Sequence, residues 1–140
     1  ACNRILNLLY RATAWANVAD NAASSPFTNV YVALHTATLT AATNSQAENE
    51  VAYTNYARQA VARSTGWDAA SGGSTANAAL LQFPQSGATG ATLAAVSTGT
   101  VVSGATAVWH YGTLNSPITI GAAASITPQF LAGALVITET

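Results

Sequence analysis

The sequence predicts an all-β protein, a jelly-roll-like β-sandwich preceded by one amphipathic helix. Three observations predict this class. About eight short runs have the composition and alternation of strands, Gly, Pro, Ser and Asn turns separate these runs, and helical spacing is confined to the N-terminal segment. The chain of 140 residues has no internal repeat. It is therefore expected to form a single domain over 1–140, with a helix at about 3–20 and a sandwich at about 28–139.

The N-terminal helix is predicted from Asn3 to Asp20 by an apolar stripe at three- and four-residue spacing. Asn3 is placed to act as the N-cap, and Pro26 disfavours helix in the residue before it. Because the stripe is wide, we expect the helix to lie on a sheet or on a copy of itself. The stripe consists of Ile5, Leu8, Leu9, Ala12, Trp15, Ala16 and Ala19.

The first strand is predicted at 29–36, where Val30, Val32 and Leu34 share one face. The opposite face is also apolar, so this strand is expected in the middle of a sheet with cover on both sides. A long surface loop follows at 37–49, and a flexible turn is predicted at 70–74. Further strands are predicted at 53–63, 77–83, 93–97, 107–111, 117–120, 126–130 and 134–138.

Arg58 places a charge among apolar neighbours, Ala57, Ala60 and Val61. Because a buried charge is costly unless it is paired, we expect Arg58 to bind Glu50 or Glu48, or to face a partner protein. The pair of Arg58 and Glu50 is the predicted internal brace.

Charged residues make up only 6% of the chain, no lysine is present, and the net charge is −1. A nucleic-acid-binding protein needs clustered cations, so direct nucleic-acid binding is not expected. A surface of Ala, Ser, Thr, Asn and Gly is instead suited to close packing against other protein. No apolar run is long enough to span a membrane, and no signal peptide is recognised. The one cysteine, Cys2, cannot form an intrachain disulfide, which fits synthesis in a reducing cytoplasm.

Catalytic and metal-binding patterns are not found in the sequence. His35 and His110 have neither the spacing nor the neighbouring ligands of a metal site. No serine stands in a Gly-x-Ser-x-Gly elbow, and Gly72-Gly73 lacks the pattern of a phosphate-binding loop. We therefore expect no cofactor and no enzymatic activity. The aromatic residues that could line a sugar-binding face are interpreted as core or interface anchors: Tyr56, Trp67, Trp109 and Tyr111.

The order of motifs resembles a family of small virion proteins of tailed bacteriophages. The shared layout is a Leu-rich helix, a Val-Tyr-Val-Ala-Leu-His-Thr strand, an acidic residue with Tyr-Ala-Arg-Gln, an Asn before a strand ending in Phe-Pro, an aromatic strand and a closing Gly-x-Leu-x-Ile-Thr. Relatives carry Trp-Gly shortly after Phe-Pro, where this chain has 86–90 instead. The matching residues are Leu6–Tyr10, Val30–Thr36, Glu50, Tyr56–Gln59, Asn77, Phe83-Pro84, Trp109–Leu114 and Gly133–Thr138.

Members of that family are capsid cement (decoration) proteins or are named tail fibres, and this chain is most similar to the jelly-roll cement protein of a short-tailed Bordetella phage. The resemblance implies a structural protein on the outer surface of the icosahedral head, made in the host's bacterial cytoplasm, which bridges copies of the major capsid protein. Self-association as a homodimer is also expected. The alternative is a tail-fibre or receptor-binding module. The predicted contact surfaces are the helix and the 37–49 loop, with Leu8, Trp15, Tyr31 and Trp109 as interface residues.

Overall fold

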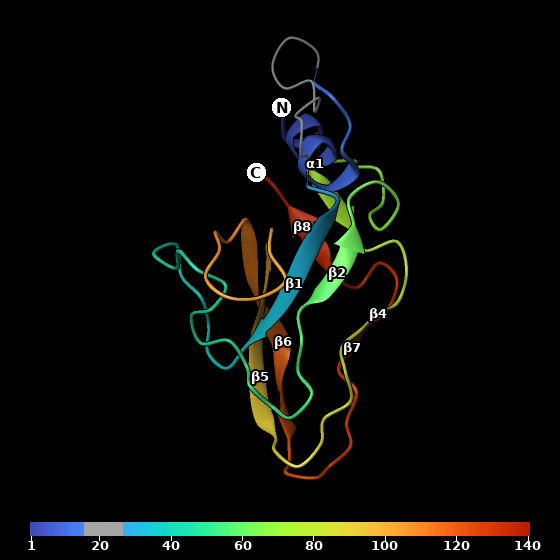
Figure 1. Cartoon of the computed structure of the whole chain (residues 1–140). Coiled ribbons are helices and arrows are strands. Elements are labelled where there is room, and N and C mark those ends of the chain that lie inside the picture. Colours follow the sequence, from blue (N-terminus) through green and yellow to red (C-terminus); the bar gives the residue numbers. More distant parts are fainter. Residues whose placement is uncertain (16–26) are drawn as a thin grey trace. The chain divides into compact units, whose positions relative to one another are not determined.

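The computed structural model describes residues 1–15 and 27–140 and confirms the predicted class, an all-β sandwich type of fold with a short N-terminal helix and sheets that do not close into a barrel (Figure 1). Contacts group the chain into two compact units. Unit 1 comprises Ala1–Val30, Val61–Leu81 and Phe130–Thr140, and unit 2 comprises Tyr31–Ala60 and Gln82–Gln129. Both units are assembled from separate stretches of the chain. That the chain forms a single domain stays a prediction.

Helix α1 (Cys2–Arg11) is shorter than the predicted helix at 3–20. It ends at Ala12, which adopts a left-handed conformation (φ 53°) and donates its N–H to the carbonyl of Asn7. Residues 12–15 are not helical, and the rest of the predicted helix, with the turn before Pro26, lies outside the described residues. The N-cap is Ala1 rather than Asn3, because the helix begins at Cys2 and already includes Asn3. The Asn3 side chain instead accepts the N–H of Gly73 (2.6 Å).

The core of unit 1 forms where α1 meets the loop after β2 (Gln59–Ala62). Leu6, Tyr10 and Trp67 are fully buried, and the rings of Tyr10 and Trp67 meet edge to face at 4.6 Å between centroids. Nearby, β3 (Ser74–Ala76) pairs antiparallel with β8 (Val136–Thr138). The predicted flexible turn at 70–74 therefore leads directly into a strand that the sequence pattern did not indicate.

The main sheet has the order β2-β1-β5-β6. Residues 31–35 of β1 (Asn29–His35), which belong to unit 2, pair with β5 (Ala91–Gly99). Strand β5 pairs in turn with β6 (His110–Ile120). Side chains on both faces of β1 are buried, as the sequence predicted. Strand β6 joins the two strands predicted at 107–111 and 117–120 into one, with a bulge between them: Leu93 opposes Ile118 while Ala95 opposes Thr113.

Three predicted strands are much shorter in the structure. Of 53–63 only β2 is extended, because Tyr53 to Tyr56 forms a turn with Asn55 at φ 78°. Of 77–83 only β4 (Leu81–Gln82) remains, since Asn77 uses its side chain to bind the loop that holds Leu131. Among the strands of the described residues, β7 (Gln129–Phe130) pairs only with β4. In the same part of the chain β8 pairs only with β3, whereas the sequence predicted a position inside a larger sheet.

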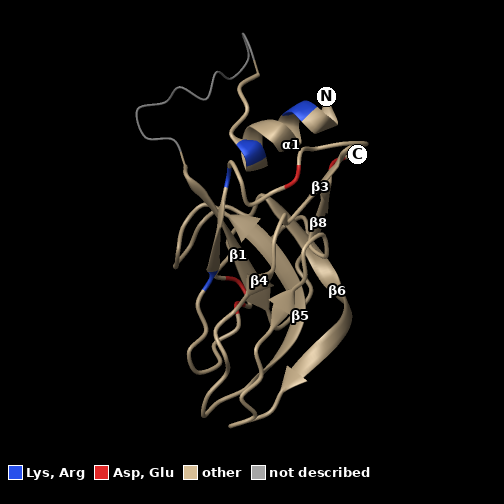
Figure 2. Cartoon of the chain, turned by 90° about the vertical axis from the view of Figure 1, so that its right-hand side faces the viewer, with Lys and Arg blue, Asp and Glu red and all other residues tan. Residues whose placement is uncertain are grey.

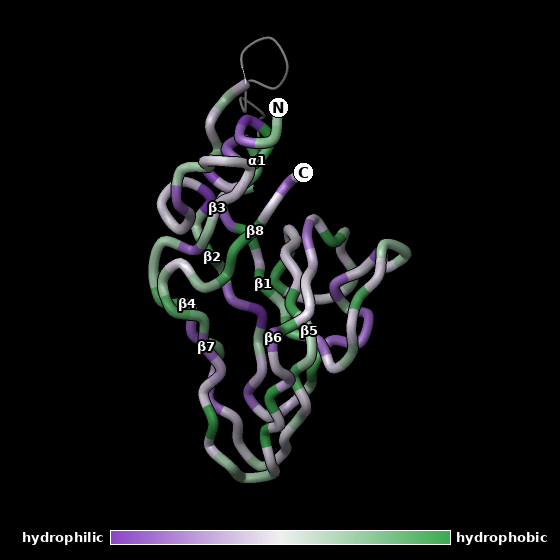
Figure 3. Tube along the Cα trace, turned by 180° about the vertical axis from the view of Figure 1, so that it is seen from behind, coloured by the Kyte–Doolittle hydropathy of each residue, from purple (hydrophilic) through white to green (hydrophobic). Residues whose placement is uncertain are grey.

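Charge is sparse along the described chain, as the few coloured segments of Figure 2 show. No Asp, Glu, Lys or Arg lies between Asp68 and Glu139. Hydrophobic and hydrophilic segments instead alternate along the chain, with a hydrophobic segment at β8 (Figure 3). None of the helices in the described part of the chain is long and apolar enough to span a membrane.

Candidate functional site

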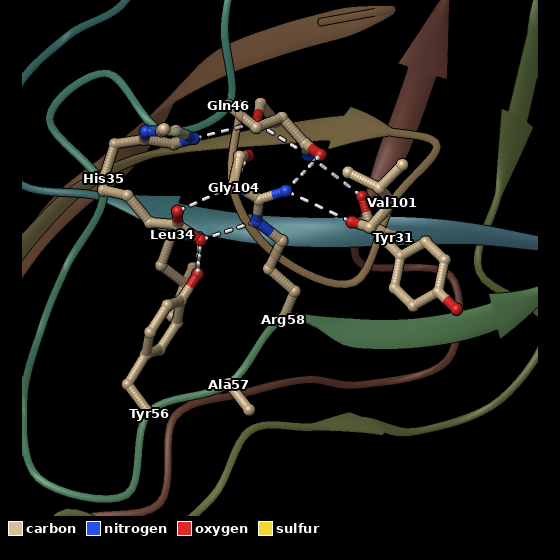
Figure 4. A network of polar contacts seen from close by, with 12 residues as sticks. Tyr31, Leu34, His35, Gln46, Tyr56, Ala57, Arg58, Val101 and Gly104 are labelled. Carbon is tan, nitrogen blue, oxygen red and sulfur yellow. Dashed lines mark hydrogen bonds and ion pairs between the residues drawn. The ribbon is translucent and has the colours of Figure 1, made fainter. Parts of the chain in front are cut away.

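A buried network of polar side chains in unit 2 is the most elaborate site in the described residues, and Figure 4 shows it from close by. At its centre, Arg58 forms a bidentate ion pair with Glu50: Nε lies 2.7 Å from Oε1, and Nη2 lies 2.8 Å from Oε2. The Arg58 side chain is 1% exposed and that of Glu50 is 18% exposed. The structure thus brings the two predicted bracing residues together.

Arg58 also holds the loop that connects β5 to β6. Its Nη1 donates to the carbonyl of Val101 (3.1 Å), and its Nη2 donates to that of Gly104 (2.7 Å). The guanidinium therefore neutralises a carboxylate and binds a loop with its remaining N–H groups, which the planar five-donor geometry of arginine allows. A lysine could not make all of these bonds at once.

Tyr56 connects the ion pair to strand β1. Its hydroxyl donates to Glu50 Oε1 (2.9 Å) and accepts the backbone N–H of Leu34 (3.1 Å). Burial raises the pKa of Tyr56 well above its usual range, so the hydroxyl keeps its proton and remains a donor. The Tyr56 ring stacks on that of Phe83 at 6.2 Å between centroids, which fixes the direction of the hydroxyl.

The second half of the network runs from Gln46 through Ser97 to His35. Gln46 Nε2 donates to the carbonyl of Tyr31 (3.0 Å) and to Ser97 Oγ (3.2 Å). His35 Nε2 lies 2.8 Å from Ser97 Oγ, and its Nδ1 lies 2.8 Å from the carbonyl of Glu48. Because a carbonyl only accepts, Nδ1 carries the proton, and Nε2 accepts the hydroxyl proton of Ser97.

The burial of His35 and its acceptance of the Ser97 hydroxyl proton both favour the neutral imidazole at neutral pH. Burial lowers the pKa of His35, and the nearby Arg58 lowers it further, whereas the carbonyl of Glu48 and the charges of Glu50 and Glu48 act in the opposite direction. Ser97 and His35 have the spacing of a nucleophile and its base, but they are 1% and 0% exposed, so no substrate can reach them. The pair therefore holds the 46–48 segment on the sheet.

A glycine makes room for Gln46 on the sheet. A Cβ atom at Gly99 would lie 2.3 Å from Gln46 Oε1 and 2.9 Å from the carbonyl oxygen of Ala107. Non-bonded contacts of a Cβ atom are essentially never this short, so any larger residue at 99 would displace Gln46 from Ser97 and from the carbonyl of Tyr31. The sequence pattern did not single out Gly99, Gln46 or Ser97.

The neutral His35 predicts a specific dependence of stability on pH. Its pKa is lower in the folded chain than the value of about 6.5 expected when unfolded, so the unfolded chain binds more protons in acid. The stabilisation is complete above about pH 6.5 and is lost as the pH falls through the folded pKa. Denaturant unfolding of the wild type and of His35→Asn between pH 8 and pH 5 measures this, and the variant should lose less stability with acid. Equal slopes would contradict the assignment.

The four predicted interface residues are each half-buried and lie in different parts of the chain. Leu8 lies on α1, and Trp15 follows α1 with its ring 5.7 Å from the Arg4 guanidinium. Tyr31 lies on β1, and Trp109 precedes β6, with its backbone N–H donating to the carbonyl of Thr98. Their role at an interface stays a prediction, as does that of the 37–49 loop.

A second buried arginine, in unit 1, was not predicted as a site. Arg63 is 6% exposed and donates to three carbonyls, those of Leu8, Leu9 (2.6 Å) and Phe27 (2.7 Å). Two of these carbonyls belong to the last turn of α1, where backbone acceptors have no partner within the helix. Arg63 thus supplies donors to carbonyls at the end of α1 that further helical turns would otherwise have satisfied. The apolar neighbours Val61 and Ala62 were the only signal in the sequence.

An open hollow lies beside the ion pair, lined by Glu50, Tyr53, Tyr56, Val102 and neighbouring residues. Burial raises the pKa of Tyr53 to about 12, and its hydroxyl donates to the carbonyl of Pro84 (2.9 Å).

Among the described residues, no group of three or more His, Cys, Asp or Glu is placed to hold a metal ion.

The fold and the network together define a β-rich protein whose buried polar side chains hold its loops in place. The family model described as Podophage GP4 fiber I protein gp80 matches residues 1–138. The chain therefore belongs to this family of phage structural proteins. None of the curated proteins compared with the chain matches it.

Proposed function

We propose that this chain is a non-enzymatic structural subunit of the exterior of a phage particle, and that it forms part of a fibre. The match of residues 1–138 to a family described as a podophage fibre protein is the observation that carries the proposal. Because the match covers nearly the whole chain, the described role concerns this fold rather than an accessory segment.

The geometry of the network supports a structural role. The buried polar side chains of Arg58, Gln46, His35 and Ser97 are engaged with one another or with backbone carbonyls. Such a network stabilises one arrangement of loops and leaves its polar groups no freedom to bind a substrate. The sparse charge favours burial against other protein subunits, since uncharged surface loses little hydration when it is covered.

Capsid cement is the second candidate, and the absence of Asp, Glu, Lys and Arg between Asp68 and Glu139 favours it. In this role, copies on the outer surface of the head would bury uncharged surface across the boundaries between major capsid proteins. Contacts with two capsomers at once would raise the effective concentration, so that modest single contacts hold firmly. The partners would be the major capsid protein and a second copy of the chain.

The number of copies per particle separates the two candidates. Quantitative mass spectrometry of purified virions, with labelled peptides of this chain and of the major capsid protein, measures the ratio directly. A handful of copies, in a multiple of the tail's symmetry, is expected for a fibre subunit. Hundreds of copies would show the cement role instead, and absence from the virion would contradict both.

Phage particles assembled without this chain distinguish the fibre role from the cement role by a second, independent measurement. Particles made without a cement protein should lose resistance to heat and low salt, whereas particles without a fibre subunit should keep intact heads and lose adsorption to the host. Complementation with the wild-type gene is the control, because it restores the lost property only if the chain itself is responsible.

A further inference from the structure

Strand β6 is the outer strand of the sheet in unit 2. It pairs with β5 on one side, and among the strands of the described residues none pairs with its other side. Figure 2 shows β6 as a long strand at the margin of its sheet. Because an edge strand directs unpaired backbone N–H and C=O groups outward, it is a template for a further strand.

The usual means of protecting such an edge are only partly present in β6. Proteins protect edges with Lys and other charged side chains, with Pro, with bulges or with a covering segment. No Asp, Glu, Lys or Arg occurs in β6. The bulge at 114–117, which includes Pro117, interrupts the edge in its middle but leaves a stretch paired with β5 on either side, at 110–113 and 118–120.

Two large apolar side chains accompany this edge on one face of the sheet. Tyr111 opposes Ser97, and Ile118 opposes Leu93. Because residues 93 and 97 of β5 lie on the same face, Tyr111 and Ile118 also share that face. Each is 45% exposed, so the edge combines unpaired backbone groups with apolar surface on both sides of the bulge.

We propose that β6 pairs antiparallel with β6 of a second copy of the chain, so that the sheet continues across a two-fold axis. An antiparallel edge is complementary to itself under two-fold symmetry, since any contact of one residue with another is repeated with the two copies exchanged. The edge offers no charge to attract a charged partner, and a net charge of −1 gives two copies almost no mutual repulsion. A second copy therefore fits this edge better than an ionic partner.

The size of the edge predicts a weak, reversible dimer. Eleven residues extend at most about 36 Å at about 3.3 Å per residue, and a sheet is about 10 Å thick, so each copy contributes roughly 360 Å². A standard interface takes about 800 Å² from each partner. The pairing should therefore be populated at high concentration or where a particle holds copies side by side, and this holds on a fibre or a head alike.

Sedimentation velocity of the full chain, from about 10 µM to about 1 mM, tests the proposal in the range where weak interfaces associate. The wild type should shift from monomer towards dimer as the concentration rises. The double variant Tyr111→Lys/Ile118→Lys should remain monomeric at the highest concentration, because two like charges on the edge of each copy repel those of the partner.

The matched control is Leu131→Lys/Val136→Lys, which adds the same charge at exposed apolar positions of unit 1 (62% and 56% exposed) and should dimerise like the wild type. The variant Tyr111→Thr/Ile118→Thr adds no charge and should retain a weaker dimer, and circular dichroism verifies that each variant is folded. A wild type that stays monomeric at about 1 mM, or a lysine variant at β6 that dimerises like the control, would overturn the proposal.

Discussion

Glu50→Ala should lower the free energy of unfolding by about 3–5 kcal/mol, because it leaves the buried guanidinium of Arg58 without its carboxylate. The loss also removes the acceptor of the Tyr56 hydroxyl. A domain of ordinary stability has about 5–15 kcal/mol in total, so roughly a fifth of it or more depends on this residue. Denaturant unfolding, followed by tyrosine and tryptophan fluorescence, measures the change.

Glu48→Ala is the matched control for that experiment. It removes the same charge two residues away, but the Glu48 side chain is exposed and only its backbone carbonyl joins the network. Exposed substitutions of this kind usually change stability by less than about 0.5 kcal/mol. In addition, Glu50→Ala combined with Arg58→Ala should cost less than the sum of the two single changes, since the pair acts as a unit. If Glu50→Ala were no more harmful than Glu48→Ala, the brace would not exist.

Arg63→Ala should destabilise the chain by about 3–4 kcal/mol, because three backbone carbonyls lose a charged donor at once. The carbonyls of Leu8 and Leu9 lie at the C-terminal end of α1, where a cation is also favoured by the helix dipole. Arg63→Lys should recover only part of the loss, since an ammonium cannot match the three directions. Thermal unfolding, monitored by circular dichroism, measures both variants.

Arg4→Ala provides the comparison for Arg63, since it removes the same charge from an exposed position on α1. Its guanidinium lies over the ring of Trp15, a contact with a cost of about 0.5–1 kcal/mol when lost at an exposed site. An Arg63→Ala variant as stable as Arg4→Ala would show that Arg63 does not support the end of α1.

Some of this architecture follows from the sequence because local patterns determine it. Alternating apolar residues on both faces of 29–36 indicate a central strand, and β1 is buried in the way that the pattern requires. A charge among apolar neighbours required a partner, and Glu50 is the residue that binds Arg58. In both cases the physical requirement is contained within a short stretch of the chain.

Other features depend on contacts between residues distant in sequence, and no local pattern reveals them. The helical stripe continues past Arg11, but Arg63 binds the carbonyls of the last turn and Ala12 adopts a left-handed conformation. Strand β3 follows two glycines that indicate a turn, and it is extended because β8 pairs with it. Gln46 lies on the sheet only because Gly99, 53 positions further along the chain, lacks a side chain.

The central claim, that this chain is a structural subunit on the outside of a phage particle, is tested most directly by a density map of the intact virion at a resolution that traces β-strands. We predict density for the chain on the exterior, in a fibre, with its uncharged β-surface covered by neighbouring subunits. A complete map that accounts for every exterior subunit without this chain, or that shows the chain inside the particle, would contradict the claim.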